Sequence, residues 1–387
     1  MRDAVIVDVV RTPSGRGKPG GALSGIHPVD LAVGVLTAVL ERNGLESGQI
    51  DDVIMGCVSQ VGDQSLNIGR QAVLAAGFDE TVPATTIDRQ CGSSQQAAHF
   101  AAQGVIAGAY DIVIAAGVES MSRVPLGSSA AGGSTPAGIA ARYPDGLVNQ
   151  GVSAELIAAR WGFGRDELDA FAAESHRRAA EAWEHGSFDS QVVSVGDVVT
   201  DETVRAGTTV ERLAGLAPAF RSDEMAARFP EIGWSITPGN SSPLTDAASA
   251  VLIMSADRAA ELGLTPRARF HAFTVVGDDP LLMLTGPIPA TRRILERSGL
   301  GVDDLDAYEV NEAFASVPLA WQRDLDADPA KLNPWGGAIA LGHAVGASGT
   351  RLLGTLVAHL EATGGRYGLQ TMCEGGGLAN ATIVERL

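Results

Sequence analysis

Residues 40–45 read LERNGL, and residues 295–300, which lie 255 positions further along, read LERSGL. In both copies a helical pattern ends at a glycine, and an acidic loop then leads into a run of apolar residues. At the same offset the Ile-Asp pair at 50–51 matches the Leu-Asp pair at 305–306. The shared order of helix, glycine cap, loop and strand predicts a duplicated half-domain.

Short β-branched runs alternate with amphipathic stretches in the first and last thirds of the chain. Residues 53–56 and 111–117 predict buried strands, and residues 94–109 between them have the Ala-rich spacing of a buried helix. Residues 307–310 and 369–372 predict the corresponding strands near the other end. This alternation indicates a layered α/β fold.

The middle of the chain, residues 120–240, follows a different pattern. It contains a stretch rich in Gly, Ser, Ala and Pro at 127–138, followed by helical patterns at 153–161 and 165–184. We therefore expect a loop-rich segment inserted into one half of the duplicated fold, where insertions often cover or shape a site.

The composition excludes several classes of protein. Of the 387 residues, 45% are hydrophobic and 19% are charged, so the chain can bury a large core and is not disordered. Its formal charge of −18 makes it a poor general nucleic-acid binder. No apolar run approaches the roughly 20 residues of a membrane span, no signal-peptide pattern is present, and the three cysteines form no disulfide framework. We expect a cytoplasmic protein that binds neither nucleic acid nor membrane.

Cys91 lies in the stretch DRQCGSSQ (88–95), where an extended segment gives way to a helix. A thiol at a helix N-terminus feels the positive end of the helix dipole, which predicts a lowered pKa and a reactive thiolate. Gly92 would let a substrate approach the backbone closely. A buried structural cysteine is the alternative interpretation.

His343 lies in the glycine-rich stretch GGAIALGHAVGASG (336–349). Small residues surround this imidazole, which is unusual for a histidine of a protein core. An imidazole beside a thiol is typical of nucleophilic cysteine catalysis, in which the imidazole is the base. The alternative is a glycine turn with an incidental histidine. The other histidines have helix-face or surface contexts, and we assign them no role.

Cys373 ends a predicted strand and precedes the glycine run 375–377. Backbone N–H groups in such a run can form an oxyanion hole, and a second thiol suits proton transfer to or from a carbon acid. Asn311 also follows a predicted strand, where it could hold a water or a carbonyl. A structural cysteine and a helix-capping asparagine are the alternatives, and Cys57 is interpreted as a core residue.

Motifs for metals and nucleotides are missing from the sequence. It has no CxxC pair, no HExxH and no cluster of histidines with carboxylates. It also lacks GxSxG, a P-loop and a GxGxxG that opens a helix after a strand. We therefore expect no metal site, no nicotinamide chemistry and no nucleotide hydrolysis.

Together these motifs resemble the thiolase family, the acetyl-CoA acyltransferases. The similarity runs nearly end to end in ordered blocks. These blocks are VVRTP (9–13), QCGS (90–93), GVESMS (117–122), GPIPA (286–290), NEAF (311–314), the stretch 336–349 and CEGG (373–376).

The resemblance implies a thiolase-like α/β fold in which two duplicated half-domains form α-β-α-β-α layers, with an inserted loop domain. Residues 1–118 and 241–266 would form the N-terminal half. Residues 119–240 would form the inserted domain, and residues 267–387 the C-terminal half.

The same resemblance implies roles for individual residues. Cys91 would be the nucleophile that carries the acyl group, and His343 would activate it. His343 would also donate to the oxyanion of the thioester, aided by a water on Asn311. Cys373 would be the acid and base that moves the α-proton. The backbone N–H groups of Cys91 and Gly375 would hold the oxyanion of the acyl-enzyme.

Contacts with coenzyme A are implied in the same way. Ser242 would lie near the pantetheine arm, and Met283 would line the same tunnel. At the substrate loop, residues 149–152 with Gln150 replace the His-Met of short-chain biosynthetic members. This departure favours degradative members that handle bulkier, ring-derived acyl chains. A longer insert than usual carries Arg221, a candidate phosphate contact, for which a solvated surface loop is the alternative.

The activity that the resemblance implies is thiolytic cleavage of 3-ketoacyl-CoA by free CoA in the degradation of fatty acids or related acyl chains. A biosynthetic thiolase that forms acetoacetyl-CoA is one alternative, and a non-catalytic acyl-CoA or lipid-binding protein is another. Coenzyme A would be a co-substrate, with no permanently bound cofactor. A homodimer or homotetramer is expected, and partner subunits of a β-oxidation complex stay open.

Overall fold

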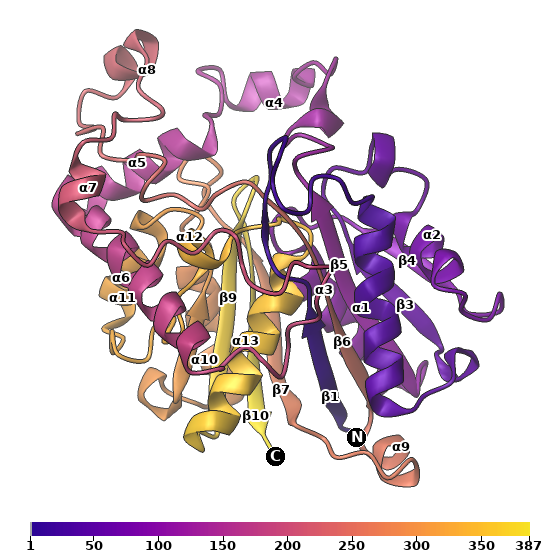
Figure 1. Ribbon diagram of the computed structural model, residues 1–387. Helices are drawn as coiled ribbons and strands as arrows, with labels where there is room; N and C mark the ends of the chain where they lie inside the picture. The colour runs from indigo at the N-terminus through magenta and orange to yellow at the C-terminus, as the bar shows by residue number, and fades with distance from the viewer. Residues whose placement is uncertain (1) are drawn as a thin grey trace.

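A computed structural model describes residues 2–387 as one α/β assembly in which helices cover both faces of a long sheet (Figure 1). The strands of the N-terminal half are β1 (Ala4–Arg11), β2 (Gly15–Arg16), β3 (Asp52–Gly56), β4 (Ala84–Ile87), β5 (Ile112–Ser120) and β6 (Thr245–Ser255). Its helices are α1 (Pro28–Asn43), α2 (Ile68–Ala75), α3 (Ser93–Ala107) and α9 (Ala256–Glu261).

The C-terminal half contains the remaining strands of the described residues. They are β7 (Ala268–Gly277), β8 (Ala307–Val310), β9 (Tyr367–Glu374) and β10 (Leu378–Arg386). Its helices are α10 (Pro287–Ser298), α11 (Ser316–Leu325), α12 (Ala338–Leu341) and α13 (Ser348–Thr363).

The strands of the described residues form a single mixed sheet of ten strands. Its order is β4-β3-β5-β6-β1-β7-β10-β9-β8, and β2 pairs with β6. β1 and β7 pair only where Val5 and Ile6 face Arg269 and Ala268. A narrow seam therefore joins two sheets of similar topology, each with antiparallel strands near the seam and parallel strands at its outer edge.

The repeat seen in the sequence extends through both halves. Helix α13 begins 255 positions after α3, and strand β9 begins 255 positions after β5. Gly44 and Gly299 end α1 and α10 in the left-handed conformation, with φ of 60° and 74°, which glycine adopts without strain. The expected duplicated α/β fold is confirmed. The predicted strand 111–117 continues to Ser120.

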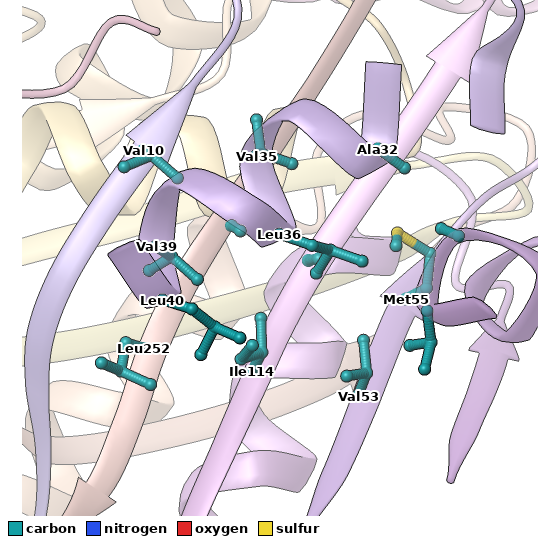
Figure 2. Close-up of a cluster of buried hydrophobic side chains, with 14 of the residues drawn as sticks. Val10, Ala32, Val35, Leu36, Val39, Leu40, Val53, Met55, Ile114 and Leu252 are labelled. Carbon is teal, nitrogen blue, oxygen red and sulfur yellow. The ribbon is translucent and has the colours of Figure 1, made fainter. Parts of the chain in front are cut away.

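Helix α1 covers the outer face of the N-terminal half. Pro28 fixes its first turn, and the imidazole of His27 accepts from the N–H of Val29 (3.2 Å). Its buried side chains lie over β3, β5 and β6, as Figure 2 shows for Leu36 above Ile114. Burial of this apolar face, at about 25 cal/mol per Å² of apolar surface, stabilises the outer layer.

Helices α3 and α13 form the layer between the two halves. The alanines of α3 pack with Leu353 and Leu356 of α13 and with strands from both sides of the seam. A Cβ on Gly349 would collide with the backbone of Gln95, so the helices touch at their N-terminal turns. The residues just before each helix are thereby brought to the same place, Cys91 before α3 and His343 before α13.

The segment between β5 and β6 forms helices that pack on the other half of the molecule. They are α4 (Ala137–Arg142), α5 (Gln150–Trp161), α6 (Arg165–Glu184), α7 (Val210–Ala214) and α8 (Asp223–Arg228). Figure 1 places α5, α6 and α7 beside α11 and α12 of the C-terminal half. Ala154 and Ile157 of α5 join Phe314 and Ala315 in one apolar cluster. The inserted segment thus closes one side of the region where α3 and α13 begin.

Candidate active site

The turn that carries Cys91 is built by its own side chains. The Asp88 carboxylate accepts from the N–H of Gln90 (2.6 Å), and the Ser93 hydroxyl accepts from the N–H of Arg89 (2.9 Å). Gln90 has φ of 49°, a left-handed conformation that is strained for a residue other than glycine. This sharp turn places Cys91 directly before α3.

Cys91 carries a protonated thiol. Burial, followed by the charge of Glu374, raises its pKa to about 12, while the N–H groups of Cys91 and Gly375 oppose this rise. The lowered pKa predicted from the helix dipole is therefore wrong, because desolvation and a nearby carboxylate outweigh the dipole. The two opposing N–H groups lie within reach of the sulfur, where they can also stabilise a developing oxyanion.

His343 is held as a neutral imidazole whose two ring nitrogens have different neighbours. Its Nδ1 lies 2.6 Å from the Ser348 hydroxyl, which donates its own proton to the carbonyl of Ala344 (2.9 Å). With the hydroxyl donating to Ala344, Nδ1 carries the ring proton and Nε2 keeps its lone pair. Burial, assisted by Arg351, lowers the pKa of His343 to about 3. Thr245 fixes the loop by accepting from the N–H of His343 (2.9 Å).

Asn311 lies next to Nε2 of His343. Its Nδ2 is 3.5 Å from Nε2, and its buried Oδ1 has no hydrogen-bond partner. The N–H of Asn311 donates to Thr371 (3.0 Å), which holds the residue at the end of β8. An amide with one atom near the imidazole and the other unused is suited to hold a water molecule.

Cys373 lies at the end of β9 and is fully buried. Burial raises the pKa of its thiol well above the ordinary value, and the charges of Cys91 and Glu374 raise it further. The thiol is therefore protonated and able to donate its proton. Gly376 and Gly377 follow with φ of 84° and 76°, so the glycine run makes a tight turn directly after the strand.

Two adjacent cavities open onto Cys91. The larger, about 760 Å³, is lined by Gln150, Met283 and Gly375 among others. The smaller, about 240 Å³, brings together Cys91, His343, Ser242 and Gln150. The structure thus gathers around one sulfur most of the residues that the sequence singled out. Asn311 and Cys373 are not among the residues that line either cavity, but Asn311 contacts His343 and Cys373 lies close enough to Cys91 to be affected by it.

Arg221 does not join this group. It is exposed, precedes α8 and lines neither cavity. Arg89 does line the larger cavity, and sequence reasoning passed over it although it lies in the same block as Cys91. Ser348 was also missed. The available signal was its position as the first residue of α13, five positions after His343, because a side chain at the start of a helix can reach back to the loop before it.

Two further properties concern metal binding and membrane spans. Within residues 2–387, no group of three or more His, Cys, Asp or Glu side chains is arranged to hold a metal ion. In that same part of the chain, every helix is too short or too polar to cross a membrane.

Comparisons with known proteins agree along the whole chain. The model of the thiolase N-terminal domain matches residues 4–257, and that of the thiolase C-terminal domain matches residues 264–386. A steroid 3-ketoacyl-CoA thiolase of Mycobacterium tuberculosis, FadA6, is 45% identical, with 100% of this chain and 95% of the relative covered. A 3-ketoacyl-CoA thiolase of Saccharophagus degradans is 42% identical, with 100% and 99% covered. The crystal structure of the acetyl-CoA acetyltransferase of Bacillus anthracis superposes with a TM-score of 0.89 at 38% identity, covering 100% of this chain and 99% of that one.

Proposed function

The chain belongs to the thiolase family, and on this premise we propose that it cleaves 3-ketoacyl-CoA with free CoA to give acyl-CoA and acetyl-CoA. It is an acyltransferase, and its relatives of 42% and 45% identity are 3-ketoacyl-CoA thiolases. The observation that carries the proposal is the cavity that Cys91 and His343 line together.

In the first step, Cys91 attacks the ketone of the substrate. Nε2 of His343 takes the thiol proton as the sulfur bonds to C3, so the imidazole becomes a cation only while the attack proceeds. The C3 oxygen becomes an oxyanion, for which the N–H groups of Cys91 and Gly375 are the donors at hand. Each such donor is worth on the order of 10²–10³ in rate.

In the second step, the bond between C2 and C3 breaks. The acyl group stays on Cys91 as a thioester, and the electron pair moves onto C2 to form the enolate of acetyl-CoA. His343, now protonated at Nε2, and a water on Asn311 donate to the enolate oxygen. Cys373 gives its proton to C2, and acetyl-CoA leaves.

In the third step, free CoA removes the acyl group. Its thiol passes a proton to the Cys373 thiolate, and its sulfur attacks the thioester on Cys91. The acyl-CoA product leaves, Cys91 takes back the proton from His343, and all three groups return to their starting states. No permanently bound cofactor is needed, and CoA is a co-substrate.

We assign a bulky acyl chain to the larger cavity. Its wall beside Cys91 includes Gly127, Ser129 and Ala130, so small side chains leave a volume of about 760 Å³ next to the nucleophile. Ser242 lines the smaller cavity, which suits the pantetheine arm. The relative named as a steroid thiolase is consistent with a ring-bearing acyl group.

The remaining parts of the proposal rest on the family. We place the enzyme in the cytoplasm as a homodimer or homotetramer. Arg221, which is exposed just before α8, stays a candidate contact for the CoA phosphates.

The test is CoA-dependent cleavage of a 3-ketoacyl-CoA series, from acetoacetyl to long-chain and ring-bearing members, followed as loss of the ketoacyl absorbance. The expected result is cleavage that becomes more efficient as the acyl group becomes bulkier. If no member is cleaved while CoA esters still bind, the chain is an acyl-CoA-binding protein and the proposed activity is wrong.

A further inference from the structure

A buried carboxyl group next to the nucleophile has no place in the steps above. Glu374 is the last residue of β9, lies between Cys373 and Gly375, and is fully buried. Its Oε1 packs against Gly92, where a Cβ would not fit. With its amide oriented to satisfy both of its atoms, Asn380 donates to that oxygen (2.9 Å) and accepts from Gln96 of α3 (3.3 Å). The other oxygen, Oε2, has no partner.

Glu119 occupies the equivalent place in the other half, 255 positions earlier and near the end of β5. Its carboxylate accepts from the backbone N–H groups of Val58 (2.9 Å), Ser59 (3.0 Å) and Gly346 (3.0 Å), and from the amide of Gln64 (2.7 Å). Each carboxyl therefore faces the loop that precedes the central helix of the opposite half. Glu119 is saturated with donors, whereas Glu374 is not.

The charged groups around Glu374 are few. Burial raises its pKa well above the ordinary value, Arg89 opposes this rise, and Asp88 adds to it. The thiols of Cys91 and Cys373 are the other titratable neighbours, and the charge of Glu374 raises the pKa of each. Glu119 acts on Cys91 in the same direction, from the other side. The imidazole of His343 shares the smaller cavity with Cys91.

We propose that Glu374 is a positioning residue for Cys91: its side chain packs the Cys91 turn against the end of β9 and, when ionised, places a negative charge beside that turn. The nucleophile then becomes reactive only when a substrate carbonyl sits between the N–H groups of Cys91 and Gly375, and the resting thiol is shielded from electrophiles and oxidants. The inference rests on the proposed function, because that function identifies Cys91 as the nucleophile. The packing of Glu374 against Gly92 does not depend on the proposed function.

Alkylation of Cys91 by iodoacetamide tests this inference without substrate. The rate is measured from pH 6 to pH 10 on the whole protein, and the Cys91 peptide is followed by mass spectrometry. Glu374→Gln removes the charge and keeps the shape. Because burial raises the pKa of Glu374, we expect the two curves to coincide at low pH and to separate as Glu374 ionises, with about tenfold faster alkylation of the variant at pH 10. Glu374→Met, a second neutral variant, should show the same separation from the wild type. Glu374→Asp keeps the charge and should follow the wild type.

Asp52→Asn is the matched control. Asp52 is the first residue of β3, at the opposite end of that strand from Cys57, and its half-buried carboxyl accepts from Tyr110 (2.9 Å). The proposal is overturned if both neutral variants follow the wild-type curve, or if Asp52→Asn moves it equally. Turnover of 3-ketoacyl-CoA is measured separately. A wild type that alkylates as expected but does not turn over would contradict the proposed function alone, and unshifted neutral variants of an active enzyme would contradict the role of Glu374 alone.

Discussion

The loops before α3 and α13 occupy equivalent places in the two halves, yet they are held in different ways. The His343 loop is fixed by direct hydrogen bonds, from its backbone to Glu119 and Thr245 and from its imidazole to Ser348. The Cys91 turn packs on Glu374 with few hydrogen bonds across the seam. The two halves thus contain two similar loops with different roles. Hydrogen bonds hold the imidazole of His343 rigidly in one loop, whereas in the other loop neighbouring groups set the pKa of the Cys91 thiol.

The largest effect on activity is expected from removing Cys91, the proposed nucleophile of the loop before α3. Cys91→Ala removes the nucleophile, so thiolysis should fall by about 10³-fold or more while the fold persists. The measurement is the initial rate with the best substrate of the 3-ketoacyl-CoA series. Cys57→Ala is the matched control, since that buried cysteine is the core residue at the end of β3 and should keep most of the activity. Substantial turnover by Cys91→Ala would show that another group attacks the substrate.

The next effect concerns the two equivalent carboxyls. Glu119→Gln replaces an acceptor oxygen with an NH₂ group that faces two N–H donors, so we expect a loss of about 2–4 kcal/mol in the free energy of unfolding. Glu374→Gln keeps its single accepted bond and should cost less than about 1 kcal/mol. Urea unfolding at pH 7 measures both. Equal losses in the free energy of unfolding would mean that Glu119 and Glu374 stabilise the protein to the same extent, contrary to the hydrogen bonds described above.

A smaller effect should follow removal of the group that orients the base. Ser348→Ala frees Nδ1 of His343, so the imidazole loses its fixed tautomer and kcat should fall about tenfold to a hundredfold. Thr350→Ala is the control, because its hydroxyl lies in the same turn of α13 but contacts Ser249 (2.6 Å) instead. Steady-state kinetics of both variants give the comparison. A wild-type kcat for Ser348→Ala would show that Ser348 is not needed to orient the imidazole of His343.

The last effect is a pH dependence of stability that arises from Glu309 of β8. Burial raises the pKa of Glu309 to about 8 from an ordinary value of 4.5, and Arg351 opposes this rise. Between these values the folded chain holds a proton that the unfolded chain has released, so this stabilisation is complete below about pH 4.5 and is lost as the pH rises to about 8. Glu309→Gln should therefore gain free energy of unfolding relative to the wild type from pH 5 to pH 8. Urea unfolding at several pH values measures the difference, and a difference that does not change with pH would contradict the assignment.

The features that local sequence determines were predicted well. The repeated helix end could be recognised because a glycine cap is a local signal, and α6 spans the predicted residues 165–184. Cys91 and His343 stood out because small residues and glycines surround each of them in the sequence. The thiolase family and its fold, which the motifs implied, are confirmed by the comparisons.

The features that depend on distant contacts were not predictable in this way. The pKa of Cys91 is raised, not lowered, because packing of the two halves buries the thiol and also brings to the turn a carboxyl that lies 283 positions away in sequence. The short helix α8 lay in a stretch interpreted as loop, although Ser222 caps it by accepting from Met225 (3.2 Å). The tertiary structure also decides which arginine lines the larger cavity. Arg89 lines it, and Arg221 does not.

The most direct test of the account is the site of the acyl-enzyme. The enzyme is mixed with a 3-ketoacyl-CoA in the absence of free CoA, quenched in acid and digested, and the acylated peptide is identified by mass spectrometry. The account predicts one acyl group, bound as a thioester to Cys91, that disappears when CoA is added before the quench. An acyl group on Cys373 or Cys57, or the release of acetyl-CoA with no acylated peptide, would contradict it.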